Sequence, residues 1–333
     1  TGQPITIIKD NEAMAREQAA TLRGYEWAGI SPGDKQARFW GQASNNFDVF
    51  KNNIKDFLLN RRRYSAFNYT EEKLKYYLKD LLKYQPTYLY GYASILFELA
   101  LIILENKSSF KFPSLKAIIS TSEILHQEMR TKIEAAFGVK VFNEYGCGEV
   151  GTIAHEDQNG IMFINAENLF IEIVDENDQP VLNGSGRIIV TELSNKAQPL
   201  VRYDIGDYGE LCHSDQKFNK SLPILKNIHG RAYDIVIGPN KRKYHPEFFI
   251  YIFEKIKNEF QDCIKQFQII QNNRALIFNI IKNSSYNNNK IESLVTEKLK
   301  QEFQDYFSYH FEYVEVIARE KSGKMRVVKR IDN

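Results

Sequence analysis

Residues 143–151 read NEYGCGEVG and follow a short apolar run at residues 139–142. We interpret this stretch as the end of a strand that opens into a loop. Its three glycines allow the backbone to turn tightly and to come close to a ligand. Tyr145 offers a flat face on which a base can stack, and Glu149 offers a carboxylate of the kind that Mg²⁺ binds. A glycine-rich strand-to-helix turn with one exposed acid has the same pattern, so the other segments must decide.

The composition is that of a globular protein large enough for two domains. The chain has 333 residues, of which 43% are apolar and 26% are charged. Single hydrophobic cores usually stop growing near ~250–300 residues. The formal net charge of +2 creates no field that would recruit nucleic acid or a membrane surface. Small, neutral or weakly charged substrates therefore remain open.

The cysteines and the apolar runs predict a cytoplasmic protein. Cys147, Cys212 and Cys263 show no C-x-x-C spacing, which fits a reducing compartment. No apolar run reaches the ~18–20 residues of a membrane span, because the run at residues 94–104 is short and contains Glu98. The opening TGQP matches neither a signal nor a transit peptide, and it reads as though the chain were entered within a loop.

Helices and short buried strands alternate in the amino-terminal part of the sequence. Sheets built from such strand, helix, strand units bind ligands at the carboxyl ends of the strands. We therefore expect Ser122, Glu123 and the Tyr145 loop on one rim of a parallel sheet, with a plain helix start at residues 121–123 as the alternative. The predicted helices cover residues 11–28, with Asn11 as cap, 70–84, with Thr70 as cap, and 126–137, and the predicted strands cover residues 37–40 and 115–120.

The pattern changes to short alternating strands, at residues 169–174 and 186–192, in an antiparallel region that spans residues 162–210. Gly206 and Asp207 then predict a turn that presents a carboxylate. A buried pair of Arg202 with Asp204 and an exposed turn acid are the structural alternatives. Arg61, Arg62 and Arg63, which lie earlier in the chain, are expected to form a solvated face.

The sequence restarts at residues 229–234, HGRAYD, which we take as a domain boundary. The remainder has the mixed pattern of a small α+β lobe. A basic loop, REKSGKMR at residues 319–326, follows it, and a solvated charged loop is its plain interpretation. The predicted elements of the lobe are helices at residues 246–258 and 290–303 and strands at residues 266–270, 275–280 and 311–317.

Five segments, in this order, resemble motifs of the adenylate-forming enzyme superfamily, and within it the branch of phenylacetate-coenzyme A ligases and CapK-like capsule-biosynthesis proteins. The match spans nearly the whole chain. It implies an α/β fold with a large multi-sheet N-terminal domain, residues 1–229, that lacks its amino-terminal part, and a small mobile α+β lobe, residues 230–333. The segments are TGQP at residues 1–4, YGCGE at 145–149, RYDIGD at 202–207, GRAYD at 230–234 and SGK at 322–324.

The resemblance also implies a role for each matching residue. Lys324 and Glu149 are the expected catalytic residues, and Glu149 is the expected magnesium ligand. The acid pocket is expected at Tyr92, Ser94 and Gly146. The residues expected to contact the nucleotide are Thr1, Gly2, Ser122, Glu123, Glu144, Tyr145, Gly146, Asp207 and Arg231.

An enzyme of this kind activates a carboxylic acid with ATP and Mg²⁺ and passes the acyl group of the acyl-AMP to coenzyme A. The carboxylate and the α-phosphate repel each other, and Mg²⁺ on Glu149 together with the ammonium of Lys324 would neutralise that charge. An aryl or apolar acid is expected. Transfer to an amine or a sugar in capsule polysaccharide synthesis is an alternative, and so is a non-catalytic nucleotide-binding protein. We expect neither a nucleic-acid partner nor a membrane span, and a homodimer is left open.

Three departures from the family pattern bear on these expectations. Most of the phosphate loop that precedes TGQP in the family is absent from this sequence. Gly148 stands where many relatives have Thr or Ser, whose hydroxyl contacts the α-phosphate. His155 and Met162 stand where some relatives have Cys and His ligands of a zinc site, so zinc is not expected.

Overall fold

The computed structural model of the chain describes residues 6–40, 53–66, 69–105, 110–212, 220–231, 235–244, 246–260, 263–283, 287–318 and 326–331. Contacts between residues divide the chain into two compact units. One contains Thr1–Ile205 and Gly209–Ile228, and the other contains Gly206–Tyr208 and His229–Asn333. The α/β class, with a large sheet unit and a small α+β unit, is confirmed.

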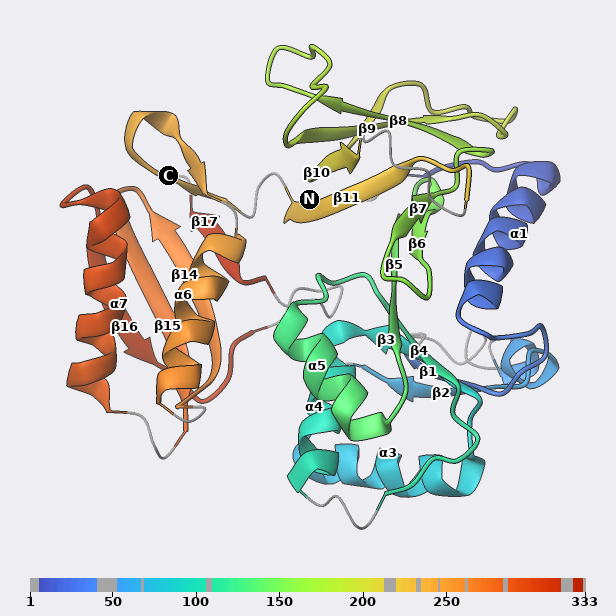
Figure 1. Cartoon of the computed structure of the whole chain (residues 1–333), viewed down its shortest axis with the longest axis horizontal. Helices are drawn as coiled ribbons and strands as arrows, with labels where there is room; N and C mark the ends of the chain where they lie inside the picture. The colour runs from blue at the N-terminus through green and yellow to red at the C-terminus, as the bar shows by residue number, and fades with distance from the viewer. Residues whose placement is uncertain are drawn as a thin grey trace. The chain divides into compact units, whose positions relative to one another are not determined.

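The large unit is built on an eleven-stranded sheet whose strand order is β2-β1-β3-β4-β5-β6-β7-β11-β10-β9-β8 (Figure 1). Its first five strands in this order are parallel, as the strand, helix, strand pattern predicts. They are β2 (Arg61–Ser65), β1 (Gln36–Trp40), β3 (Tyr88–Tyr92), β4 (Ala117–Thr121) and β5 (Val141–Cys147).

Helices cover the two faces of this parallel part with different cores. Leu89 of β3 packs in the core formed by α3 (Glu71–Tyr84), α4 (Ala93–Glu105) and α5 (Gln127–Phe137). Its neighbours Tyr88 and Tyr90 pack instead with Tyr25 of α1 (Asn11–Trp27). Because successive side chains of a strand point to opposite faces, α1 lies across the sheet from the other three helices (Figure 1).

Two helix caps show how local chemistry sets the boundaries. Thr70 caps α3 by accepting a hydrogen bond from the N–H of Lys73 at 3.3 Å, as predicted. The predicted cap of α1 is wrong by one residue, because Asp10 rather than Asn11 accepts from the N–H of Ala13, at 2.8 Å. A carboxylate at this position also interacts favourably with the helix dipole.

The remaining strands of the large sheet include the antiparallel pairs β5–β6, β6–β7 and β8–β9, in agreement with the alternating pattern. One expectation here is wrong. Gly206 and Asp207 lie inside β10 and do not form a turn between strands, although Gly206 has a positive φ of 75°. The strands are β6 (Gly151–Glu156), β7 (Met162–Ile164), β8 (Leu169–Val174), β9 (Gly186–Glu192), β10 (Tyr203–Cys212) and β11 (Ile224–Arg231).

The small unit has a four-stranded sheet of order β16-β15-β14-β17 under two helices (Figure 1). Its core is aromatic, with Phe249, Phe253, Phe278 and Phe303 almost fully buried. Sequence reasoning placed its third strand too late, at residues 311–317. Its helices are α6 (Pro246–Glu259) and α7 (Asn288–Phe303). The strands of its sheet are β14 (Ile264–Asn272), β15 (Ala275–Lys282), β16 (Ser308–Tyr313) and β17 (Val328–Ile331). A separate pair, β12 (Val236–Ile237) and β13 (Lys243–Tyr244), is joined by a short 3-10 helix, η1 (Pro239–Lys241).

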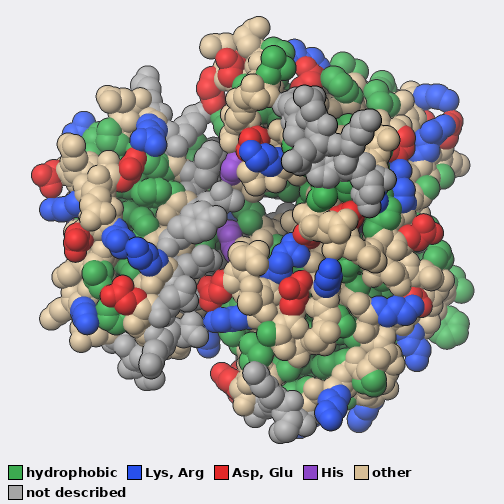
Figure 2. Space-filling model, in the orientation of Figure 1, with side chains coloured by type: hydrophobic (Ala, Val, Ile, Leu, Met, Phe, Trp, Pro, Cys, Tyr) green, Lys and Arg blue, Asp and Glu red, His purple; other side chains and the backbone are tan. Residues whose placement is uncertain are grey.

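Charged side chains of both signs are mixed on the surface. On the face drawn in Figure 2, basic and acidic side chains are interspersed, and neither sign of charge covers a large area. This mixture fits the small net charge. Among the helices of the described residues, none has the length and apolar character that crossing a membrane requires.

Candidate functional site

The carboxyl ends of the central parallel strands lie at one level. In the strand register, Tyr92 of β3 is opposite Thr121 of β4, and Thr121 is opposite Glu144 of β5. Ser122 and Glu123 follow directly after β4, and Tyr145 follows Glu144. The sheet therefore brings Ser122, Glu123 and Tyr145 to one rim, the position at which sheets of this kind bind ligands.

Ser122 and Glu123 form a sharp exit from β4. Ser122 has a φ of 67°, a left-handed conformation that is uncommon for a residue with a side chain. It turns the chain so that Oε2 of Glu123 accepts a hydrogen bond from the backbone N–H of Ser94 at 2.8 Å. Ser94 lies in the first turn of α4, where a carboxylate is favourable. The Glu123 carboxylate thus fixes the start of α4 against the rim.

The Tyr-Gly segment differs from the predicted loop because β5 continues through it to Cys147 before the chain turns into β6. The two strands pair antiparallel with an irregularity between Tyr145 and Gly146. A Cβ atom on Gly146 would lie 2.4 Å from the carbonyl oxygen of Gly151, so glycine is required there. Gly148 is different, since it is exposed and an added Cβ would meet no atom within 4 Å.

Glu149 lies half-buried in the turn that joins β5 to β6. Its Oε1 accepts a hydrogen bond from the hydroxyl of Tyr203, at the start of β10, at 3.4 Å. Burial, aided by the charge of Glu149, raises the pKa of Tyr203. Burial also raises the pKa of the Cys147 thiol to about 12, so this thiol is neutral at pH 7. Sequence reasoning missed Tyr203, whose only signal was its place within the RYDIGD segment.

The turn fits a Mg²⁺ ion that is shared with phosphates. Mg²⁺ keeps several waters and is usually bound by one or two carboxylates together with substrate phosphates. The single carboxylate of Glu149, oriented by Tyr203, meets that requirement. The described residues contain no group of three or more His, Cys, Asp or Glu side chains that could form an all-protein metal site.

The Glu144 side chain is directed into the core, where it joins a polar cluster that the sequence did not reveal. Its Oε1 accepts from the hydroxyl of Tyr90 at 2.8 Å, and its Oε2 lies 3.7 Å from Nε2 of His155. The ring of Tyr25 packs edge-on against His155, with centroids 5.8 Å apart. A Cβ on Gly24 of α1 would lie 2.2 Å from this imidazole, so glycine makes room for it.

Burial determines the charge states in this cluster. It lowers the pKa of His155, although the nearby Glu144 charge acts in the opposite direction. It raises the pKa of Tyr90 well above its usual value. Since His155 packs against Tyr25 and Glu144, its imidazole is a core group in this structure.

Tyr92 is buried at the end of β3, with its ring centroid 4.6 Å from that of Trp40. Asp207 lies half-buried in β10, and Arg231 is the last residue of β11. Thr1, Gly2 and Lys324 lie outside the described residues, and so does the Arg231 side chain. The roles assigned to these residues stay predictions.

The alternative in which Arg202 pairs with Asp204 is wrong. Nε of Arg202 lies 3.2 Å from Oε2 of Glu172, and Nη1 of Arg187 lies 2.5 Å from Oδ2 of Asp204. Both Arg202 and Asp204 are exposed. Asp207 lies three residues further along β10, and its predicted role as a nucleotide ligand stays a prediction.

Comparisons with known proteins agree with this architecture. Residues 236–331 match the CapK C-terminal domain family. The chain is 30% identical over 278 residues to Protein CapK of Staphylococcus aureus, an alignment that covers 80% of this chain and 58% of that protein. The chain thus spans 58% of the length of that curated relative.

Solved structures of CoA ligases share the fold. A 2-hydroxyisobutyryl-CoA ligase in complex with 2-HIB-AMP has a TM-score of 0.71 at 18% identity, over 96% of this chain and 70% of that one. The anthranilate CoA ligase AuaEII in complex with anthranoyl-AMP has a TM-score of 0.65 at 14% identity, over 93% and 61%. At such identities the similarity establishes the fold, and both of those proteins were captured with an acyl-adenylate.

Proposed function

The chain is a CapK-like member of the adenylate-forming superfamily, and on this premise we propose that it couples a carboxylic acid to ATP as an acyl-adenylate. One observation carries the proposal: Tyr145 and Glu149 flank the turn at the carboxyl rim of β4 and β5, and Tyr203 orients the Glu149 carboxylate. This rim combines an aromatic face, a glycine-lined backbone and one oriented acid. These features suit an adenine ring, a phosphate chain that approaches the backbone, and a Mg²⁺ ion shared with the phosphates.

The chemistry requires two anions, the acid's carboxylate and the α-phosphate, to come together. Mg²⁺ bound through Glu149 would supply charge neutralisation at the phosphates. In our proposal Tyr145 stacks on adenine, Asp207 accepts from the ribose hydroxyls and Arg231 holds the nucleotide. The ammonium of Lys324 stabilises the charge that develops as the carboxylate oxygen bonds to phosphorus and pyrophosphate leaves.

We propose coenzyme A as the acceptor of the acyl group. Its thiol would attack the acyl carbonyl, and AMP would leave. The acid would lie beside Tyr92, Ser94 and Gly146, and the buried aromatic ring of Tyr92 favours an aryl or other apolar acid. Residues 230–333 would act as a mobile lobe that carries Lys324 away from the adenylate, so that the thiol can enter.

The test is pyrophosphate exchange into ATP with a panel of aryl and aliphatic acids, using the complete native protein. Exchange that depends on one class of acid supports adenylate formation. Binding of ATP without exchange for any acid would instead support the alternative of a non-catalytic nucleotide-binding protein.

The acceptor needs a separate experiment, because an amine or a sugar could take the acyl group, as the resemblance to capsule-biosynthesis proteins implies. The preferred acid and ATP are incubated with coenzyme A, an amino sugar or a simple amine, and the products are identified by mass spectrometry. A thioester as the main product supports coenzyme A, whereas an amide or ester as the main product assigns the other acceptor.

A further inference from the structure

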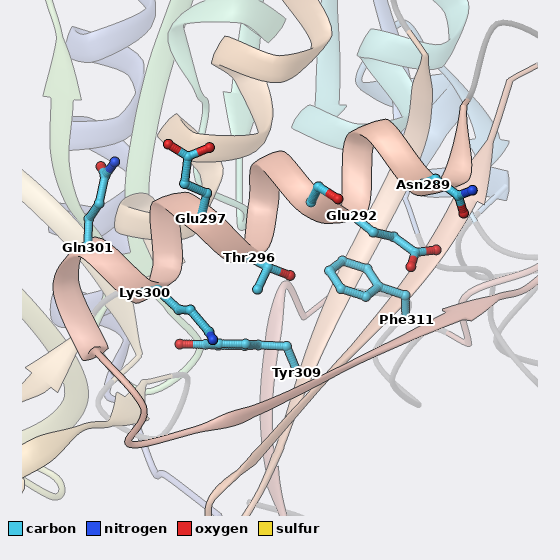
Figure 3. Close-up of a pocket in the computed structure, with 9 residues that line it drawn as sticks. Asn289, Glu292, Thr296, Glu297, Lys300, Gln301, Tyr309 and Phe311 are labelled. Atoms are coloured by element: carbon cyan, nitrogen blue, oxygen red, sulfur yellow. The ribbon is translucent and has the colours of Figure 1, made fainter.

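A groove runs between α7 and β16 of the small unit, and none of its lining residues is assigned a role in the reaction. It consists of two shallow, open depressions of about 860 and 550 Å³ that share Thr296, Lys300 and Tyr309 in their linings, which makes them continuous. Figure 3 shows α7 on one side of the groove and the aromatic side chains of β16 on the other. The groove lies entirely within one unit, so its shape depends on that unit alone.

The strand that borders the groove presents an open edge. β16 is the last strand of its sheet, and no described strand lies beyond it. The N–H of Ser308 donates to the carbonyl of Arg274 at 2.8 Å, towards β15. Because backbone groups alternate in direction along a strand, the N–H and C=O groups of Tyr309 and Phe311 face outward. An edge of this kind is a template for another strand.

The side chains along the groove have a self-complementary order. Glu292 and Lys300 are equally spaced on either side of Thr296 along α7. In Figure 3, Lys300 lies by Tyr309, Glu292 lies by Phe311, and Thr296 lies between them. A two-fold axis near Thr296 would therefore place Glu292 of one copy opposite Lys300 of a second copy, and this contact would occur twice.

The same axis suits the strand. Antiparallel pairing of two β16 strands about His310 sets Tyr309 of one copy opposite Phe311 of the other. These are the two residues whose backbone groups face outward, so they can exchange hydrogen bonds across the axis. Their side chains share the groove face, where cross-strand aromatic pairs are favourable.

We propose that two copies of this chain associate through this groove, with their β16 strands paired antiparallel and Glu292 of each copy facing Lys300 of the other. An open strand edge would also suit an extended peptide. The two-fold arrangement of opposite charges is what favours a second copy of this chain over a peptide. Within one copy, Lys300 lies 3.3 Å from the exposed Asp305, and Glu292 accepts from the hydroxyl of Tyr313. In these contacts the side chains of Lys300 and Glu292 still line the groove. The buried hydroxyl of Tyr309, which also lines the groove, makes no hydrogen bond with a described residue.

The test uses charge reversal in the full chain, followed by sedimentation velocity over a range of protein concentrations. The wild-type chain should dimerise reversibly. Glu292→Lys and Lys300→Glu should each raise the dimer dissociation constant at least tenfold, because each variant alone faces like charges across the axis. An equimolar mixture of the two variants should dimerise again, because Lys faces Glu at both contacts of the mixed pair. Lys79→Glu, at an exposed position of α3, is the matched control and should dimerise as the wild type does.

A second measurement covers the case in which a charge variant does not fold. Thr296→Cys places a thiol near the proposed axis, so a short bismaleimide should link residue 296 of one copy to residue 296 of the other, as identified by peptide mapping. Lys79→Cys should not form such a link. A wild-type chain that stays monomeric, single variants that dimerise as tightly as wild type, a mixture that fails to recover, or absence of the 296–296 link would each overturn the proposal.

Discussion

The hydroxyl of Tyr203 lies 3.4 Å from Oε1 of Glu149 and connects the start of β10 to the turn between β5 and β6. The contact restrains the carboxylate of a half-buried side chain in a turn. In the proposed reaction Glu149 binds Mg²⁺, so Tyr203 acts by positioning that ligand.

Replacing Tyr203 with Phe should therefore change the magnesium dependence of adenylate formation. One hydrogen bond to a charged group contributes about 1.5 kcal/mol at this long distance, which corresponds to about a tenfold higher Mg²⁺ concentration for half-maximal rate. The rate at saturating Mg²⁺ should stay within about twofold of wild type. Tyr76→Phe, an exposed change on α3, is the control. A loss of rate that is the same at all Mg²⁺ concentrations would contradict the positioning role.

Gly148 provides a second test of the proposed site. The position has no positive φ, and an added Cβ would meet no atom, so a side chain fits there. If the turn faces the α-phosphate, Gly148→Ser should lower the apparent KM for ATP or raise the adenylation rate by about tenfold relative to Gly148→Ala, because a hydroxyl adds a hydrogen bond to a charged oxygen. Comparison with Ala separates the hydroxyl from the loss of backbone freedom. Equal kinetics for Ser and Ala would place the phosphate elsewhere.

The buried His155 predicts a pH-dependent stability that is separate from catalysis. Burial lowers its pKa in the folded state, so the unfolded chain binds a proton more readily. The free energy of unfolding should therefore fall as the pH drops below about 6.5, the unperturbed value, and stop falling below the folded-state pKa. His155→Gln keeps a polar group there without this titration, and it should show a smaller loss between pH 7.5 and pH 5. Urea denaturation at both pH values measures the difference, and identical pH dependence in both proteins would assign it to other groups.

Hydrophobic periodicity and cap residues correctly predicted those helices and strands whose local sequence preference agrees with the way they are buried in the fold. Thr70 caps α3 and β4 is buried throughout, and both were predicted because burial and local propensity point the same way. Residues 143–151 were interpreted as a strand end that opens into a loop, because their glycines allow tight turns. Antiparallel pairing with β6 overrides that preference, since it supplies backbone hydrogen bonds that a single sequence cannot reveal.

Long-range charge pairing was equally hidden from the sequence. Arg61 and Arg63 were expected in a solvated face, but both bind the buried Asp56, at 2.6 and 3.0 Å. The polar core around Glu144 and His155 depends on residues far apart in the chain. Motifs identified the candidate site because they lie at the ends of strands. They could not identify Tyr203, whose contact with Glu149 depends on how the strands are arranged.

The sharpest test of the proposed function concerns Lys324, which lies outside the described residues, because its role depends on the reaction step. Lys324→Ala should leave folding and ATP binding nearly unchanged and lower adenylate formation by ~10² or more, because a preorganised charge at the reacting oxygens is worth several kcal/mol in the transition state. Thioester formation from a supplied acyl-adenylate should be spared, since the attack of the carboxylate on the α-phosphate precedes that step. Lys321→Ala, in the same basic loop, is the matched control and should affect neither step. Pyrophosphate exchange and single-turnover thioester formation measure the two halves separately. Equal losses in both halves would mean that the substitution disturbs the small unit as a whole, and the catalytic role of Lys324 would then be abandoned.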